Sequence, residues 1–213
     1  MSAHSPRILT EGETALIDAV ARSSFEGDTS LRKAAVDTIE ANGLPTSREE
    51  YFHYTDLRAL LKGNFQPAER VAEDVARDAG KPYPRLVSDA CVLHFRDGHY
   101  HDFGEDLPAG VTVSSGLPDA PKTAGNADAT SLVNTALAIG GVSLDIANGA
   151  EVDRVVGLAH AQTGATDTAS GTRFAITAGA GSKATLIERA CGPNGIGYLN
   201  SSDVKITIGD GAT

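Results

Sequence analysis

Three segments near the C-terminus decide the fold: GVSLDIANGAEV at residues 141–152, FAITAGAGSKATL at 174–186 and VKITIGDGAT at 204–213. Each consists of alternating apolar residues followed by a turn that contains Gly149, Gly181 or Gly211, and these glycines are 32 and 30 residues apart. Because successive side chains of a strand point to opposite faces, the apolar residues of each segment share one face. These same-face positions are Val142, Leu144 and Ile146, then Phe174, Ile176 and Ala178, then Val204, Ile206 and Ile208.

Further extended runs lie between these repeats, at Val152–His160 and Ala184–Arg189. A period near 30 residues with about two strands in each period is typical of a β-solenoid, in which each turn adds strands to two stacked parallel sheets. We therefore predict that residues 131–213 begin a parallel β-helix. An ordinary β-sandwich with similar hairpins is the alternative. Because the last repeat ends at Thr213, we expect a β-helix truncated at its C-terminal end.

Two helices are predicted near the N-terminus. Thr10 and Glu13 stand at the spacing of a capping box, so the first helix begins at Thr10. A second helix follows Thr29 or Ser30 and ends at Gly43, because glycine suits the left-handed position after a helix. The apolar residues of both segments recur at helical spacing. They are Leu16, Ile17, Val20 and Ala21 in the first, and Leu31, Ala35 and Ile39 in the second.

Shorter helices are predicted up to residue 80. Thr46 and Glu49 form a second capping-box pair after a proline, and Thr55 is expected to cap a helix over Asp56–Leu61. Residues 67–79 form an amphipathic helix that Gly80 and two following prolines end. Its apolar stripe consists of Val71, Val75 and Ala79. Residues 1–80 are therefore assigned to an N-terminal helical region.

Residues 81–130 are assigned to a hairpin and a linker. The run CVLHFRDGHYHDF at 91–103 predicts two strands around Asp97-Gly98, a strong signal for a two-residue turn. Residues 104–130 are rich in Gly, Pro, Asp and Ala, so we expect a loop with a short strand at Val111–Val113.

The hairpin carries three histidines that we tested as a metal site. In a two-residue hairpin His94 opposes His101 and Arg96 opposes His99, so the four side chains share one face. Three imidazoles on one face could hold a divalent metal. Since no carboxylate is fixed beside them and Arg96 would repel a cation, we interpret this face as polar and solvated, and we predict no metal or cofactor. Leu93, Phe95 and Tyr100 take the opposite, apolar face.

Composition excludes several classes of protein. The chain has a net charge of −10 with no basic block, so neither nucleic acid nor a membrane surface is an expected partner. There is no run of about 18 apolar residues and no secretory leader at the N-terminus, and we expect a soluble, cytoplasmic protein. Cys91 and Cys191 form no CxxC pair, and they are expected to be reduced, partly buried thiols.

Motifs of catalysis are absent from the sequence. There is no P-loop, no G-x-S-x-G elbow and no H-E-x-x-H, and the glycines at 179–182 and 209–212 belong to turns between strands. Adjacent acids such as Glu49-Glu50 are not held across a cleft. We expect His160 to be a satisfied histidine on a strand face. The chain is therefore predicted to be no enzyme, and no catalytic residue is assigned.

The segment GLPTSREEYFHYTDL at Gly43–Leu57 resembles the N-terminal signature of the SufB/SufD family, and of its SufD-like members in particular. A second similarity covers residues 131–149, SLVNTALAIGGVSLDIANG, which resembles the start of the family's β-helix. Two residues depart from the pattern, since Phe52 stands where the family usually has Trp and His53 where it has a basic residue. The positions that fit are Gly43, Leu44, Pro45, Thr46, Arg48, Glu50, Tyr54, Thr55, Asp56 and Leu57.

This resemblance implies a right-handed parallel β-helix and a non-catalytic scaffold subunit of a SUF-type (SufBCD) complex, which assembles iron–sulfur clusters. Its implied partners are a SufB-like β-helix paralogue and a SufC-like ATPase. The ATPase and the cluster are contacted by C-terminal parts of the family that have no counterpart here, so no cluster residue is assigned.

Two other functions remain open at this point. A carbohydrate-active enzyme on a β-helix would need clustered charged residues on one solvent-facing sheet, and a structural β-solenoid would leave the Gly43–Leu57 motif unexplained. In each case we expect self-association through the strand edges of the β-helix.

Overall fold

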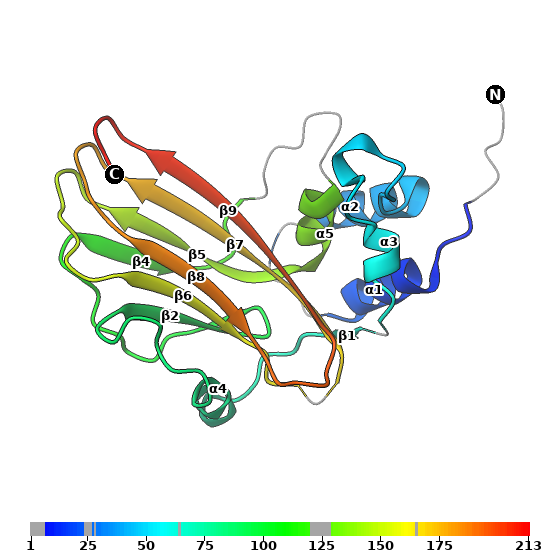
Figure 1. Ribbon diagram of the computed structural model, residues 1–213, viewed down its shortest axis with the longest axis horizontal. Helices are drawn as coiled ribbons and strands as arrows, with labels where there is room; N and C mark the ends of the chain where they lie inside the picture. The colour runs from blue at the N-terminus through cyan, green and yellow to red at the C-terminus, as the bar shows by residue number, and fades with distance from the viewer. Residues whose placement is uncertain (1–6, 24–26, 28, 64, 120–128, 165) are drawn as a thin grey trace.

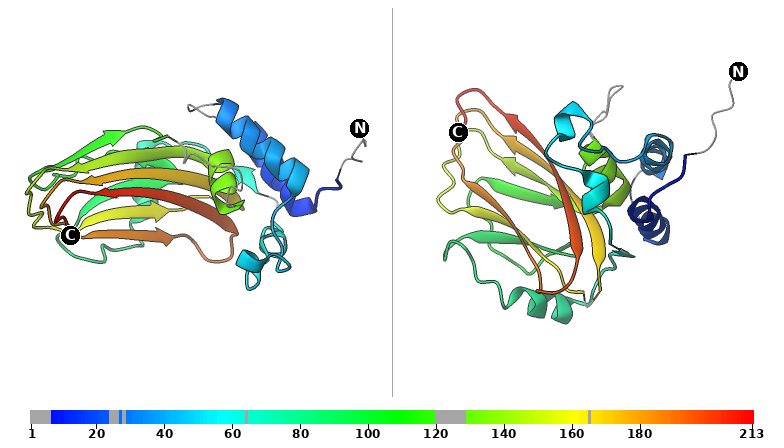
Figure 2. Two further views of the ribbon diagram at one scale, coloured as in Figure 1. Left: turned by 90° about the horizontal axis from the view of Figure 1, so that it is seen from above. Right: turned by 45° about the vertical axis from the view of Figure 1, so that its right-hand side comes forward.

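The computed structural model describes residues 7–23, 27, 29–63, 65–119, 129–164 and 166–213. The fold is mixed α and β, with two mainly parallel sheets and no closed barrel. Helices α1, α2, α3 and α5 gather at one end of the sheets, whereas α4 lies below β2 (Figure 1). Figure 2 shows the two sheets as stacked layers. The helix bounds are Glu11–Arg22 for α1, Thr29–Asn42 for α2, Leu57–Leu60 for α3, Glu73–Gly80 for α4 and Ala129–Leu137 for α5.

Both sheets consist mainly of parallel strands. The first has the order β1-β7-β5-β4 with β9 also paired to β7, and the second has the order β3-β2-β6-β8. Among the described strands, only β2–β3 and β4–β5 pair antiparallel. The first sheet contains β1 (Gln66–Pro67), β4 (Val111–Ser115), β5 (Ala138–Ile146), β7 (Thr168–Ala178) and β9 (Tyr198–Ile208). The second contains β2 (Cys91–Arg96), β3 (His99–His101), β6 (Val156–Ala161) and β8 (Leu186–Cys191).

The three predicted repeats are stacked in register. Val142 pairs with Phe174, and Phe174 pairs with Val204, so the same-face positions of β5, β7 and β9 coincide. The turn glycines have nearly identical φ values of 68°, 69° and 70° at Gly149, Gly181 and Gly211. The predicted runs between the repeats form β6 and β8, which pair with each other and not with the repeats. The sequence period therefore equals one passage through both sheets.

Apolar side chains of both sheets fill the space between them. Phe95 of β2 contacts Phe174 of β7 edge to face, with 5.1 Å between the ring centroids. The buried members of this cluster are Leu93, Phe95, Val111, Val142, Leu144, Ile146, Val156, Leu158, Phe174 and Ile176. A second cluster joins the helices to β7 through Leu16, Ile39, Leu44, Val133 and Ala169.

The N-terminal helices follow their capping residues. Thr10 caps α1 in a complete capping box with Glu13, as predicted. Helix α2 begins at Thr29 and ends before Gly43, which adopts a φ of 80° and donates its N–H to the Ile39 carbonyl. Both predicted helices are thus confirmed.

Two predictions about helix starts between residues 46 and 61 were wrong in detail. The Thr46–Glu49 pair forms half a capping box, in which the Thr46 N–H donates to Glu49 Oε1 at 3.3 Å, and only a 3-10 turn (Glu50–Phe52) follows. Asp56, and not Thr55, caps α3, since the Asp56 Oδ1 accepts the Ala59 N–H at 2.9 Å.

Helix α4 is shorter than predicted. Residues 66–67 pair with β7 instead of joining a helix, and α4 begins only at Glu73. The predicted apolar stripe does not face the protein, since Val75 is 47% exposed and Ala76 is the buried residue. Packing against β2 has therefore selected a different face.

Helix α5 was not predicted. It occupies Ala129–Leu137, where the start of the β-helix was expected, and it runs directly into β5. The Asn134 side chain donates to the carbonyls of Thr172 and Ser201 at 3.0 and 3.1 Å, which fixes α5 on the first sheet. Strand β4 is confirmed and extends to Ser115, whereas the expected loop at 120–128 lies outside the described residues. The section limits at residues 80 and 130 remain a prediction.

Candidate functional site

The pairing of the β2–β3 hairpin is as predicted. His94 pairs with His101 and Arg96 with His99 around a turn in which Asp97 and Gly98 have φ values of 47° and 84°. The polar face is not solvated, which corrects our interpretation. Arg96 is 3% exposed, His101 4% and His99 9%.

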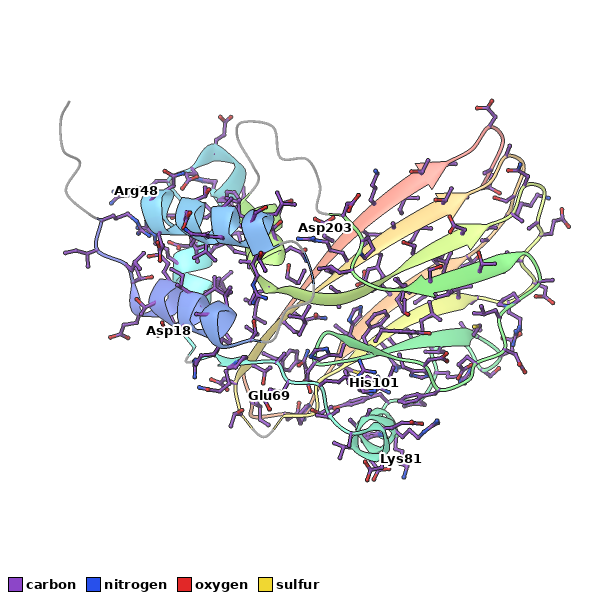
Figure 3. The ribbon with its side chains drawn as sticks, turned by 180° about the vertical axis from the view of Figure 1, so that it is seen from behind. Asp18, Arg48, Glu69, Lys81, His101 and Asp203 are labelled. Atoms are coloured by element: carbon purple, nitrogen blue, oxygen red, sulfur yellow. The ribbon has the colours of Figure 1, made fainter. Side chains whose placement is uncertain are left out.

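Helix α4 covers this face. The Arg96 Nε donates to the Ala76 carbonyl at 2.7 Å, and its guanidinium also donates to the Phe95 carbonyl at 2.8 Å. Figure 3 shows Lys81, just after α4, beside the hairpin that carries His101. A carbonyl of α4 thus takes the place of water as a hydrogen-bond acceptor for Arg96. The alternation of the strand residues does not predict this contact.

The three histidines of the hairpin do not gather into a group of possible metal ligands. Within the ranges that the structure describes, no group of three or more His, Cys, Asp or Glu side chains could hold a metal. Burial, reinforced by the positive charges of Arg70 and Arg96, lowers the pKa of His101 to about 4. Burial also lowers the pKa of His94. Contrary to our expectation, a carboxylate does lie beside His94, since Glu105 Oε1 is 3.4 Å from its Nε2.

His160 is buried between the two sheets. Its ring stacks on Phe95 at 5.0 Å and meets Phe174 edge to face at 5.7 Å. Its Nε2 lies 3.1 Å from Glu188 Oε1, a contact that lowers the pKa of Glu188. The two atoms are not aligned for a hydrogen bond, and Nδ1 has no hydrogen-bond partner among the described residues. Neither ring nitrogen therefore has a hydrogen-bond partner among the described residues, and the expectation of a satisfied histidine is wrong.

Both cysteines are free thiols, as predicted. Cys91 is buried in β2, and Cys191 donates to the His160 carbonyl at 3.1 Å. Burial raises the pKa of both thiols, so they are protonated and poorly nucleophilic near neutral pH.

A cavity of about 430 Å³ lies between the outer face of the second sheet and the segment formed by α4 and residues 81–90. We call it the cationic cavity. Basic side chains from α4, residues 81–90, β2 and β8 line it. We did not predict this cavity from the sequence. The basic residues that line it are Arg77, Lys81, Arg85, Arg96 and Arg189. These residues form no recognisable sequence motif. The one hint in the sequence was Arg189, a charged residue at an outward position of the extended run that forms β8.

The first and second sheets each end in a strand with one neighbour. Among the described strands, β9 pairs only with β7 and β8 only with β6. On β9, Ile206 is 58% and Ile208 65% exposed, whereas Ile176, the partner of Ile206 on β7, is 5% exposed. We call β8 and β9 the open edge. It presents unpaired backbone groups and apolar side chains together.

No family model and no curated protein matches this chain.

The Gly43–Leu57 motif divides into two halves in the structure. Gly43 and Leu44 serve folding, because the Leu44 side chain is buried and its N–H donates to Glu13 Oε1 at 2.8 Å. By contrast, Arg48 and Glu50 are exposed, and Tyr54 is 96% exposed. The side chains of Arg48, Glu50 and Tyr54 have no evident part in packing, whereas Asp56 caps α3 and Leu57 packs against the cluster that joins the helices to β7. In the described part of the chain, no helix is long and apolar enough to cross a membrane.

Proposed function

We propose that the protein is a non-catalytic scaffold subunit of a SUF-type complex for iron–sulfur cluster assembly. The observation that carries the proposal is the resemblance of Gly43–Leu57, together with the repeats that follow it, to the SufD-like family. The exposed half of that motif adds support, because an exposed tyrosine with no packing role is typical of a protein contact.

The proposed fold of this scaffold is a right-handed parallel β-helix. Strands β5, β7 and β9 alternate along the chain with β6 and β8 of the other sheet, as successive turns of a β-helix would. Parallel crossovers within one sheet are right-handed in nearly all proteins, which supports the proposed hand. The open edge is then the end of the stack on which a further turn would pair.

The proposed partners are a SufB-like β-helix paralogue and a SufC-like ATPase, in the cytoplasm. The buried, protonated thiols favour a supporting role over chemistry at this part of the protein. The proposal assigns no cluster ligand to these residues.

Affinity purification from the native organism tests the proposal. The tagged protein is expected to recover SufB-like and SufC-like proteins, and deletion of its gene is expected to lower the activity of cellular iron–sulfur enzymes. Tyr54→Ser should reduce the recovery several-fold, whereas Leu60→Ser should not, although Leu60 is also 66% exposed on the adjacent helix. Normal iron–sulfur enzyme activity without the gene, and no recovery of either partner, would refute the proposal.

A further inference from the structure

The cationic cavity holds more positive charge than its own acids neutralise. Glu105 is the one carboxylate among its lining residues, and it forms an ion pair with Arg85. Two further cations have carboxylate partners outside the lining, at 2.6 Å each: Arg77 pairs with Glu73, and Lys81 with Asp78. In a chain with a net charge of −10, such a concentration of cations requires an explanation.

Of the five cations that line the cavity, Arg96 and Arg189 have no carboxylate partner among the described residues. Arg96 donates to backbone carbonyls of Ala76 and Phe95, as described above. Arg189 donates to the carbonyls of Tyr83 and Pro84, the first at 3.1 Å. Carbonyl oxygens satisfy hydrogen bonds but leave each guanidinium with its full positive charge. A charge as deeply buried as that of Arg96 is costly when no counter-ion compensates it.

The floor of the cavity is apolar. Outward-facing side chains of three neighbouring strands form it, and these are Val92, Ala159 and Ile187. Gly157 leaves room above β6, and Phe103, whose ring lies 4.3 Å from the Arg77 guanidinium, closes one side. Cationic groups thus border an apolar surface within a volume typical of small-ligand sites.

We propose that the cationic cavity binds a small monocarboxylate with an apolar body. Its carboxylate accepts hydrogen bonds from Arg189 and Arg96 and supplies the missing counter-charge. Its hydrocarbon part lies on Val92, Ala159 and Ile187. A highly charged phosphate ester fits less well, because it would have to desolvate against this apolar floor and face the ionised Glu105. The inference is independent of the proposed scaffold function, since none of these residues lies in the Gly43–Leu57 motif.

Calorimetric titration of the full chain with octanoate tests this proposal. Octanoate is expected to bind saturably, and at least about tenfold more tightly than octanamide, which has the same body without the charge. It should also bind more tightly than acetate or inorganic phosphate. Absence of saturable octanoate binding, equal affinity for octanamide, or equal affinity for phosphate would each overturn the proposal.

Two variants and one control locate the site. Arg189→Gln should weaken octanoate binding about tenfold, the usual worth of a charge-assisted hydrogen bond. Lys183→Gln is the control, because Lys183 pairs with Glu151 and does not line the cavity, and its effect should stay within about twofold. Ile187→Glu places a carboxylate on the floor two residues from Arg189, and it should abolish binding even if Arg189→Gln disturbs residues 81–90. Unchanged octanoate affinity in a folded Arg189→Gln or Ile187→Glu protein would overturn the assignment.

Discussion

At the scale of single residues, Glu13 joins three segments of the N-terminal region. Its carboxylate accepts the N–H groups of Thr10 and Leu44, each at 2.8 Å, and lies 3.0 Å from Arg7 and 3.3 Å from Arg58. Burial of the side chain acts to raise its pKa, but these hydrogen bonds and Arg7 lower it to about 2. Glu13, the second member of the α1 capping box, therefore also anchors the start of the Gly43–Leu57 motif.

Glu13→Gln is expected to destabilise the protein by about 2 kcal/mol at pH 7, because a neutral amide leaves Arg7 and Arg58 without their counter-charge. The folded pKa lies below the ordinary 4.5, so the contribution of Glu13 is complete above that pH. It is lost as the pH falls towards 2, where the folded protein also takes up the proton. Urea unfolding should accordingly show a smaller difference between wild type and variant at pH 3 than at pH 7.

The control for this measurement is Glu11→Gln, which changes an exposed acid in the same first turn. It should alter the free energy of unfolding by no more than about 0.5 kcal/mol at either pH. A Glu13→Gln effect of equal size at both pH values would contradict the electrostatic explanation.

At the scale of elements, β9 differs from the strand it copies. Its apolar residues occupy the register of β7, yet Val204, Ile206 and Ile208 stay exposed, whereas Phe174 and Ile176 of β7 are buried. An apolar strand with unpaired N–H and C=O groups is a template for another strand. We therefore expect the chain to self-associate through β9.

The isolated chain is expected to self-associate with increasing concentration, and Ile206→Lys combined with Ile208→Lys should shift it towards the monomer. The charges oppose strand pairing without touching the buried core. Light scattering over a wide concentration range measures the effect. Leu60→Lys is the matched control, since it places a lysine at another exposed apolar position, away from the sheets. Strictly monomeric wild-type protein at every concentration would count against this prediction.

At the scale of the whole molecule, the strands of the two stacked sheets differ in their number of neighbours. Strands β5 and β7 have a neighbour on each side, and β2 and β6 do so in the other sheet (Figure 1). Strands β8 and β9, by contrast, each pair with one neighbour among the described strands. Stability should therefore vary across the strands and not be uniform.

Amide hydrogen exchange is expected to follow this order. Under dilute, monomeric conditions, the amides of β9 should exchange at least about tenfold faster than those of β7, and those of β8 faster than those of β6, because edge strands open without unfolding the core. Mass spectrometry of peptic fragments, or NMR, measures the rates. Equal protection of β9 and β7 in the monomer would show that the edge is as stable as the interior.

Local chemistry allowed several parts of this protein to be predicted from sequence. The Thr10–Glu13 box, the helix end at Gly43 and the Asp97-Gly98 hairpin depend on residues close together in the chain, and each is found in the structure. The register of the three repeats could also be predicted, because alternating apolar residues at a regular period can be buried between two sheets in only a few alignments. The resemblance of the Gly43–Leu57 motif to the SufD-like family was likewise found from the sequence alone.

Only the tertiary structure decided which faces are covered. Alternation placed His94, Arg96, His99 and His101 on one side of the hairpin, but the packing of α4 buried most of that side. The cationic cavity arises in the same way, since Arg189 meets the backbone of Tyr83 and Pro84 across more than 100 residues of chain. Sequence periodicity defines the two faces of a strand, whereas their solvation depends on long-range packing that no local pattern encodes.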